Sequence, residues 1–594
     1  MRITLPFTTI ALALVVTCSP QKKRDQVDAK PVLDSLLRNY HEEHLKLDPL
    51  LATSIGDNRY NDLLPNDITA EYRQQVKAFN ERYRDQLKAI DRGTLAENDR
   101  LSYDLLTYDC EIQLEGLRFK DYLIPISQFN SMTLTIAQLA SGTGNQPFKT
   151  VKDYDNWLSR LNRYLEWCDT AIVNMRRGMA SGYVIPKVLA KKVVPQLGSF
   201  DHGPAKDHLF YTPVKAFPAD FSNEDKTRLS RAYQEIIETK IIPAHKKLKD
   251  FFEKEYVPAC RETSGTDAIP DGKDFYAYSV KRWTTTNKSA DEIFALGKSE
   301  VERISKEMEL IKNQVGFKGD LKAFLQNLRN KKELMPFKNG EEIIAAYNAI
   351  HEKMKPNLLK LFERAPKTAF EVRRVEAYRE ATTAANYMEG TPDGSRPGIF
   401  YFPAVDPSHY STLGMEDLFL HEAIPGHHYQ IMLKVENTAL PDFRKFSNYG
   451  AFTEGWGLYA ESLGKELGLY TDSYSYFGML TAEMHRAIRL VVDAGMHSQG
   501  WTREQAIQYS KDHEAASEQN IISEVERYMA YPGQALSYKI GQLKILELRA
   551  KAEKELGSKF DIKQFHNQLL DFGSLPLTTL EENVTRWIEK SKSL

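Results

Sequence analysis

The octapeptide His421-Glu422-Ala423-Ile424-Pro425-Gly426-His427-His428 is the most informative part of this sequence. It places three imidazoles and a carboxylate together in a chain that has only 14 histidines among 594 residues. Neutral imidazole is a good zinc ligand, and a glutamate beside a ligating histidine can act as general base toward zinc-bound water. The octapeptide nearly matches the His-Glu-x-x-His motif of zinc peptidases, but Pro425 stands where that motif has its second histidine.

Pro425 determines how the histidines of the octapeptide lie relative to one another. Residues 415–424 have helical character. Proline has no N–H group and clashes with the carbonyl four residues earlier, and Gly426 eases a distortion of the backbone. We therefore expect the helix to kink or bulge at Pro425-Gly426.

The second metal ligand is either His427 or His428. In a straight helix His428 would share the face of His421, but about 10 Å further along the axis, and His427 would point away. A local unwinding would instead bring His427 to the position that the second histidine normally takes. The residues alone leave both histidines open.

Glu454 is the candidate third ligand, 33 residues after His421. That distance is long enough for a turn and a second helix, and Gly455 and Gly457 would let two helices approach closely. Glu461 shares the helix face of Glu454 and could accept a hydrogen bond from a ligating imidazole. The alternative for both glutamates is a helix face in contact with water.

A polar stripe recurs every four residues further along the chain. It consists of His485, Arg489, Asp493 and His497 on an otherwise apolar helix. The stripe is either a solvated face with ion pairs or the lining of an active-site cleft, with His497 as a candidate neighbour of the substrate.

Two tyrosines are candidate donors to the oxyanion that amide hydrolysis develops. Tyr538 is the first choice and Tyr528 the second, with Arg527 beside them as a further candidate; aromatic packing is the alternative for each tyrosine. Arg396, which precedes a predicted strand near Phe400, could meet a substrate carboxylate. That strand could itself pair with an extended peptide.

The N-terminus resembles a bacterial lipoprotein signal. Arg2 precedes a short apolar run from Leu5 to Val16, followed by Thr17 and Cys18. We expect residues 1–17 to be a signal peptide, Cys18 to carry a lipid, and residues 18–30 to form a polar tether. The protein would then be exported and anchored in the bacterial cell envelope, facing the periplasm.

The remainder of the sequence predicts a mainly α-helical protein over residues 31–594, with a small β element near residues 370–405. Ser289 and Glu292 form a capping box at a helix start. A subdomain boundary is possible at residues 260–272, where Pro and Gly cluster. The remaining cysteines are odd in number and widely spaced, so we expect buried thiols at Cys110, Cys168 and Cys260 rather than disulfides. A net charge of −2 gives no support for nucleic-acid binding.

Several motifs together resemble the bacterial "domain of unknown function 885" family over about residue 31 to the C-terminus. Besides the octapeptide, they are Thr284–Thr286, Asp291–Gly297, Asp393–Gly398, Phe452–Glu461, Arg527–Gln534 and Tyr538–Gly541. The family is placed among predicted zinc metallopeptidases of the glutamate-zincin kind, mostly helical, with many lipoproteins. The resemblance implies one zinc ion held by His421, His427 and Glu454, with Glu422 as base, because Pro-Gly-His is the steadier part of the family motif.

The sequence thus predicts a large multi-helix, zincin-like hydrolase of the cell envelope, most simply a peptidase acting on a peptide or small amide. Two other functions stay open: a non-catalytic peptide-binding lipoprotein, and a metal-dependent amidase or esterase. Substrate identity, endo- versus exopeptidase action and oligomeric state are not set by these motifs.

Overall fold

The computed structural model describes residues 29–142, 144–376, 380, 384–391, 394 and 396–593. The predicted signal peptide, the lipid attachment at Cys18, most of the tether and Asp393 lie outside these residues. The first helix already begins at Ala29. In the part of the chain that is described, no helix is long and apolar enough to cross a membrane.

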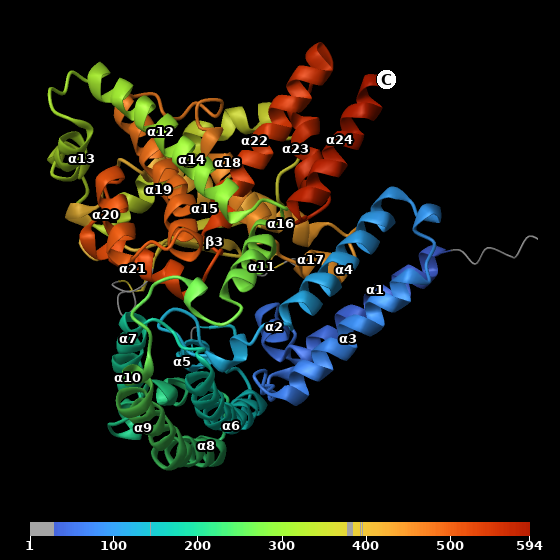
Figure 1. Cartoon of the computed structure of the whole chain (residues 1–594), viewed down its shortest axis with the longest axis vertical. Coiled ribbons are helices and arrows are strands. Elements are labelled where there is room, and N and C mark those ends of the chain that lie inside the picture. Colours follow the sequence, from blue (N-terminus) through green and yellow to red (C-terminus); the bar gives the residue numbers. More distant parts are fainter. Residues whose placement is uncertain are drawn as a thin grey trace, which may run out of the picture.

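The fold is mainly α-helical, as predicted, and Figure 1 shows it as a large upper body above a smaller lower group of helices. The N-terminal helices run along one side and form the lower group: α1 (Ala29–Leu47), α2 (Pro49–Ser54), α3 (Ala70–Lys88), α4 (Glu97–Gly116), α5 (Met132–Ala140), α6 (Val151–Ser181), α7 (Lys187–Gly198), α8 (Asn223–Ile236), α9 (Ile242–Phe251) and α10 (Val257–Ala259).

The later helices build the upper body. They are α11 (Gly272–Thr284), α12 (Ala290–Gln314), α13 (Leu321–Arg329), α14 (Gly340–Leu361), α15 (Met415–Glu422), α16 (His427–Glu436), α17 (Asp442–Phe446), α18 (Gly450–Ser462), α19 (Ser473–Ser498), α20 (Arg503–His513), α21 (Glu518–Ala530), α22 (Leu536–Leu556), α23 (Ile562–Leu570) and α24 (Leu577–Ser593). The predicted capping box starts α12: the Glu292 N–H donates to Ser289 Oγ, and the Ser289 N–H donates to Glu292 Oε2 at 2.7 Å.

A small three-stranded sheet interrupts the helices near the predicted β element. It contains β1 (Phe370–Arg374), β2 (Asn386–Met388) and β3 (Gly398–Phe402) in the order β1-β3-β2. β3 pairs in parallel with β1 and antiparallel with β2, so both of its edges are occupied. The expectation that the strand at Phe400 pairs with an extended peptide is therefore wrong, because no free row of N–H and C=O groups is left along β3.

Two large hydrophobic cores hold the helices together, and each takes residues from both sides of the loop at 260–272. Within that loop a Cβ on Gly265 would lie 2.0 Å from the carbonyl oxygen of Met496, so the loop packs tightly against α19. Cys110, Cys168 and Cys260 are buried free thiols, as predicted.

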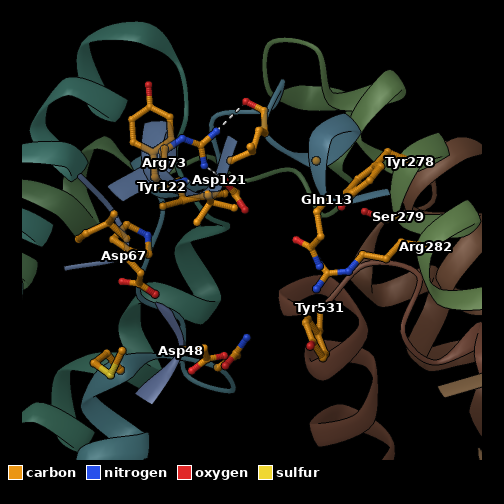
Figure 2. Close-up of a pocket in the computed structure, with 18 of the residues that line it drawn as sticks. Asp48, Asp67, Arg73, Gln113, Asp121, Tyr122, Tyr278, Ser279, Arg282 and Tyr531 are labelled. Atoms are coloured by element: carbon orange, nitrogen blue, oxygen red, sulfur yellow. Dashed lines mark hydrogen bonds and ion pairs between the residues drawn. The ribbon is translucent and has the colours of Figure 1, made fainter. Parts of the chain in front are cut away.

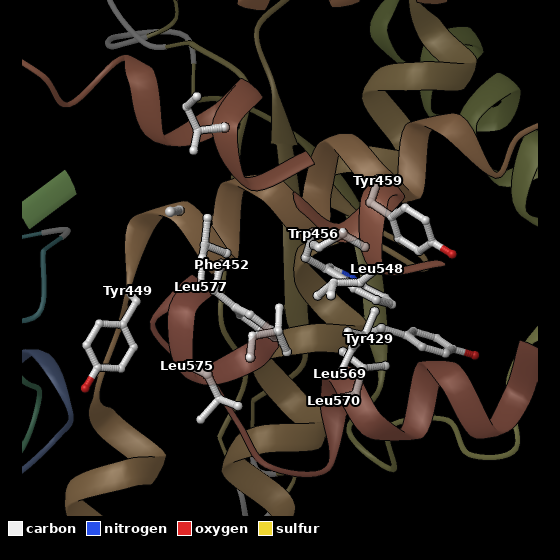
Figure 3. Close-up of a cluster of buried hydrophobic side chains, with 14 of the residues drawn as sticks. Tyr429, Tyr449, Phe452, Trp456, Tyr459, Leu548, Leu569, Leu570, Leu575 and Leu577 are labelled. Carbon is white, nitrogen blue, oxygen red and sulfur yellow. The ribbon is translucent and has the colours of Figure 1, made fainter. Parts of the chain in front are cut away.

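One part of the first core fixes the position of α18. Trp456, Phe452 and Tyr459 of α18 pack among leucines of α22, α23 and α24 (Figure 3). A Cβ on Gly455 would lie 2.5 Å from Cα of Gly541, so α18 and α22 meet almost backbone to backbone. The helix that carries Glu454 is thus held by close packing along its length.

Candidate metal centre

The helix that carries His421 breaks where the sequence predicts. α15 ends at Glu422 and α16 begins at His427, with residues 423–426 between them and a cis peptide bond before Pro425. A Cβ on Gly426 would lie 2.0 Å from the carbonyl oxygen of His421, so only glycine allows this close approach. The indole N–H of Trp456 donates to the Pro425 carbonyl at 2.8 Å and ties the break to α18.

The break brings His421 and His427 together with Glu454. The Nε2 atoms of His421 and His427 lie 3.5 and 3.7 Å from Glu454 Oε2. The two imidazole rings are nearly perpendicular, at 78°. Two ligands of a tetrahedral zinc lie roughly 3.3 Å apart when each bond is about 2.0–2.1 Å long. The three donor atoms, all within 4.8 Å of one another, therefore have the spacing of a metal site.

Glu461 lies behind the first histidine. Its Oε1 is 2.7 Å from His421 Nδ1, where it accepts the ring N–H. This contact orients the imidazole and holds a proton on Nδ1, so that Nε2 is the ring nitrogen that faces the cluster. The structure thus gives Glu461 the contact expected of a residue that supports a ligand. His427 Nδ1, by contrast, is buried without a hydrogen-bond partner among the described residues.

The electrostatics of the cluster favour a bound cation. Burial lowers the pKa of His427 to about 4, so this imidazole is neutral near pH 7. For Glu454, burial raises the pKa, but the hydrogen bond with His421 and the attraction of the neighbouring basic groups outweigh it and lower the pKa to about 2. For His421, burial lowers the pKa, but contacts with Glu454 and Glu461 outweigh it and raise the pKa to about 10. The two carboxylates therefore stabilise a positive charge on His421. A bound metal ion could supply that positive charge in place of the proton.

Glu422 is the last residue of α15 and is half-buried next to the cluster. Burial raises the pKa of its carboxyl to about 7, with smaller effects from the charges of His421 and Glu454. A carboxyl whose pKa lies near neutral pH is well suited to accept and return a proton.

Gly457 lets the His421 ring lie against α18. A Cβ there would be only 2.7 to 3.0 Å from three atoms of the imidazole. The sequence suggested that Gly455 and Gly457 permit close helix approach, and the structure assigns them different partners, α22 for Gly455 and the His421 ring for Gly457.

Gly457→Ala is therefore expected to displace the His421 ring and to weaken metal binding by about tenfold, at a cost of about 1–3 kcal/mol in stability. Competition with a chromogenic chelator and unfolding of the metal-free protein would measure the two effects. Gly450→Ala is the matched control on the same helix, because its Cβ would meet nothing closer than 3.7 Å. Equal metal affinity in both variants would contradict this account.

His428 points away from the cluster. Its Nδ1 lies 2.9 Å from the Tyr387 hydroxyl, and its ring packs against Phe370, with 5.2 Å between the ring centroids. This histidine belongs to the contact between α16 and the small sheet.

Tyr538 contacts Arg489, whose charge acts on the cluster. The Arg489 guanidinium carbon is 4.4 Å from the centre of the Tyr538 ring, and the charge of Arg489 helps to lower the pKa of Glu454. The Tyr538 hydroxyl has no hydrogen-bond partner in the described part of the chain. The Tyr528 hydroxyl, by contrast, donates to Glu524 Oε2 at 2.7 Å, and Arg489 also binds Glu524. Of the two candidates, Tyr538 is the one whose O–H is free to donate.

The other polar candidates form structural contacts. Arg527 binds Glu524 and donates to Gln534 Oε1 at 2.6 Å. Both ring nitrogens of His497 are occupied, Nδ1 by the Thr266 N–H and Nε2 by the Tyr528 carbonyl. Arg396 is exposed, and its Nη2 donates to the Glu389 carbonyl beside the sheet.

The polar stripe on α19 is not a solvated face, because Arg489, Asp493 and His497 are at most 6% exposed. Asp493 accepts hydrogen bonds from the Tyr276 hydroxyl and the Gly533 N–H. Within the stripe, Arg489 is the residue whose charge lowers the pKa of Glu454. The sequence singled out Arg489 by its spacing, but not its contact with Tyr538 or the effect of its charge on Glu454.

A family model described as "Bacterial protein of unknown function (DUF885)" matches residues 49–584. The crystal structure of a "putative lipoprotein" from Colwellia psychrerythraea is similar, with a TM-score of 0.87 and 27% identity, covering 95% of this chain and 100% of that one. A "putative lipoprotein of unknown function" from Shewanella oneidensis has a TM-score of 0.73 and 18% identity, covering 93% and 99%, a likeness of fold alone. None of the curated proteins compared with this chain matches it.

Proposed function

This chain belongs to the bacterial DUF885 family of proteins of unknown function, and from that premise we propose that it is a zinc-dependent hydrolase, most simply a peptidase. The observation that carries the proposal is the convergence of His421 Nε2, His427 Nε2 and a Glu454 oxygen within 4.8 Å. Two histidines and a glutamate are the protein ligands of a known class of catalytic zinc site.

The donor set fits zinc in chemistry as well as in spacing. His427 is neutral, Glu454 is ionised, and Glu461 holds the proton of His421 on the nitrogen that faces away from the cluster. Three protein donors leave a fourth position open. The Glu454 side chain is 23% exposed, so solvent reaches the cluster on that side.

A zinc ion held by these residues would polarise a carbonyl and make a water molecule more acidic. Glu422 accepts the proton of the attacking water at its carboxylate and returns it to the leaving amine nitrogen. The free hydroxyl of Tyr538 donates a hydrogen bond to the carbonyl oxygen as negative charge develops there. Arg489 keeps the Tyr538 ring in place by lying over its face.

We also propose that the protein is a lipid-anchored protein of the cell envelope. The support is the lipoprotein-like sequence around Cys18 and the description of the Colwellia psychrerythraea protein as a lipoprotein. Release of the full-length protein from bacterial membranes by detergent, and not by high salt, would test this anchor.

Metal analysis of protein purified with zinc tests the hydrolase proposal directly. We expect about one zinc per chain, and turnover in a peptide library screened beside small amides and esters. Protein without metal after such a purification would contradict the proposal. Turnover of esters or small amides alone would leave a metal hydrolase but exclude a peptidase.

A further inference from the structure

A cavity of about 850 Å³ lies between the N-terminal helices and the upper body of the protein (Figure 2). One wall comes from the ends of α1 and α2, from α3, from residues 67–68 and 121–131, and from the start of α5. The other comes from α11, from Gln113 of α4, from residues 447–449, and from the end of α21 with residues 531–532. Its volume is that of pockets that take small ligands, of roughly 300–1,000 Å³. A folded protein does not fit in such a space, but a short peptide does.

The cavity adjoins the helix that carries Glu454. Asn448 and Tyr449 line it and immediately precede α18. Asn448 Oδ1 accepts a hydrogen bond from the hydroxyl of Thr453 at 2.6 Å, and Thr453 precedes Glu454. Tyr449 and Glu454 are five residues apart, which corresponds to about 7.5 Å along a helix. A ligand in the cavity therefore lies at the start of α18, less than two helical turns before Glu454.

Three carboxylates face the cavity from its N-terminal wall: Asp48, Asp67 and Asp121 (Figure 2). Each makes its side-chain contacts to other residues through Oδ1: Asp48 with the Leu51 N–H, Asp67 with the Trp167 indole, and Asp121 with Arg73. Arg73 is the one cation that pairs with them in the described residues. The wall therefore carries an excess of negative charge.

The charges of the other two carboxylates act on Asp67. Burial raises the pKa of Asp67, and the charges of Asp48 and Asp121 raise it further. Burial also raises the pKa of Asp121, although Arg73 opposes this effect. Like charges that share a partly enclosed space are stabilised when a cation enters.

The opposite wall has the opposite charge. Arg282 faces the cavity there beside Tyr531 (Figure 2), and among the described residues it has no ion-pair partner. A positively charged ligand group is repelled from Arg282 and attracted to the carboxylates across the cavity. The two walls therefore orient a ligand that has a cationic end.

Two buried polar groups on the cavity walls are unsatisfied. Asn80 Oδ1 and Thr266 Oγ1 have no hydrogen-bond partner, although both residues are less than 5% exposed. Asn80 belongs to the N-terminal wall, and Thr266 lies in the loop before α11. Buried polar atoms without partners are uncommon in native proteins, and both atoms could take up a hydrogen bond from a water or a ligand.

We propose that this cavity binds a short peptide whose ammonium group lies against Asp48, Asp67 and Asp121, with the chain running toward the His421–His427–Glu454 cluster. The direction of the bound peptide rests on the proposed function. In that function, short peptides with an ammonium group are the substrate class of the metal site. The ammonium group is either the amino terminus or a lysine side chain, since both have the same charge and the same N–H donors.

Calorimetric binding to the zinc-loaded full chain carrying Glu422→Gln tests this proposal without consuming the probe. The probes are tetraalanine, N-acetyltetraalanine and an N-acetylated tetrapeptide with one lysine. We expect acetylation of tetraalanine to weaken binding by about tenfold or more, the usual effect of losing a charge-assisted hydrogen bond. If the lysine peptide binds as tightly as tetraalanine, the site accepts an ammonium group from either source. If it binds as weakly as N-acetyltetraalanine, the site accepts the amino terminus alone.

The double substitution Asp48→Asn and Asp67→Asn should remove the preference for the free amino group. Asparagine keeps the helix cap at position 48 and an acceptor oxygen for Trp167, so the fold is preserved. Asp155→Asn with Asp169→Asn is the matched control, because both lie on the exposed side of α6 and remove the same charge. The control should keep the preference.

Equal affinity for the free and acetylated peptides, a preference that survives the double substitution, or no peptide binding would each overturn the inference. These results are distinct from a failure of the proposed function. A clear preference without any hydrolysis by the wild-type protein would exclude the peptidase and leave a peptide-binding cavity. Equal hydrolysis of free and acetylated peptides would exclude the ammonium site and leave the peptidase.

Discussion

His427→Ala is expected to abolish zinc binding at micromolar metal. The substitution removes one of three protein donors, and the remaining pair of His421 and Glu454 cannot complete a zinc site. Removal of a group that only supports a ligand already costs about 10–100-fold in affinity, so loss of a ligand should cost at least about a hundredfold. Metal-to-protein ratios after dialysis against a weak chelator would measure this loss.

His428→Ala is the matched control, because His428 is the adjacent residue, is also buried, and contacts Tyr387 and Phe370 instead of the cluster. Both variants lose packing, so the unfolding of each metal-free protein would be measured separately. The control should keep about one zinc per chain. A control that loses its metal while His427→Ala keeps it would show that the second ligand is His428.

Glu422→Gln is expected to reduce turnover by about a hundredfold to ten-thousandfold, which is the usual contribution of a general base. The metal content should not change, because Glu422 is not one of the three converging donors. Glutamine has the shape of glutamate but cannot accept the proton. Rates at saturating substrate, together with zinc content, would separate loss of the base from loss of the metal.

The same variant has an expected effect on stability. Burial raises the pKa of Glu422 from 4.5 to about 7, so between these values the folded protein binds more protons than the unfolded chain. The contribution of this carboxyl to stability is therefore lost as the pH rises from about 4.5 to about 7. Metal-free Glu422→Gln should be more stable than the wild type at pH 8 by up to about 3 kcal/mol, since each pKa unit corresponds to about 1.4 kcal/mol.

Glu416→Gln on the same helix is the control for the activity measurement. Glutamine keeps an acceptor for the Tyr470 N–H that Glu416 binds, and position 416 lies away from the cluster. This control should retain activity within a few-fold. If the control lost as much activity as Glu422→Gln, or if Glu422→Gln remained active, Glu422 would not be the base.

The local features of the fold were predictable from the sequence. The capping box at Ser289 and the break at Pro425-Gly426 follow from groups within a few residues of one another. A missing N–H acts on the carbonyl four residues earlier, whatever the rest of the protein does. The residue types that could hold a metal were likewise recognisable, because imidazoles and carboxylates are few and clustered in this part of the chain.

The positions of side chains across the fold were not predictable in this way. The strand at Phe400 looked available for a peptide, but β1 and β2 occupy both of its edges. The stripe on α19 looked like a solvated face as readily as a cleft, and it is buried. Both outcomes depend on which distant segments pack against these residues.

By itself the sequence determined that the chain is mainly helical, that a helix must break after Glu422, and that zinc-binding residue types flank the break. Only the tertiary structure decided that His427 and not His428 faces His421 and Glu454, that Glu461 supports the His421 ring, and that Asp48 and Arg282 face each other across one cavity. The physical reason is the distance along the chain over which each kind of interaction acts. Backbone sterics act over about one helical turn, whereas Glu454, Glu461 and Arg282 lie 27 to more than 200 positions from the residues they meet, and only the packing of helices brings them together.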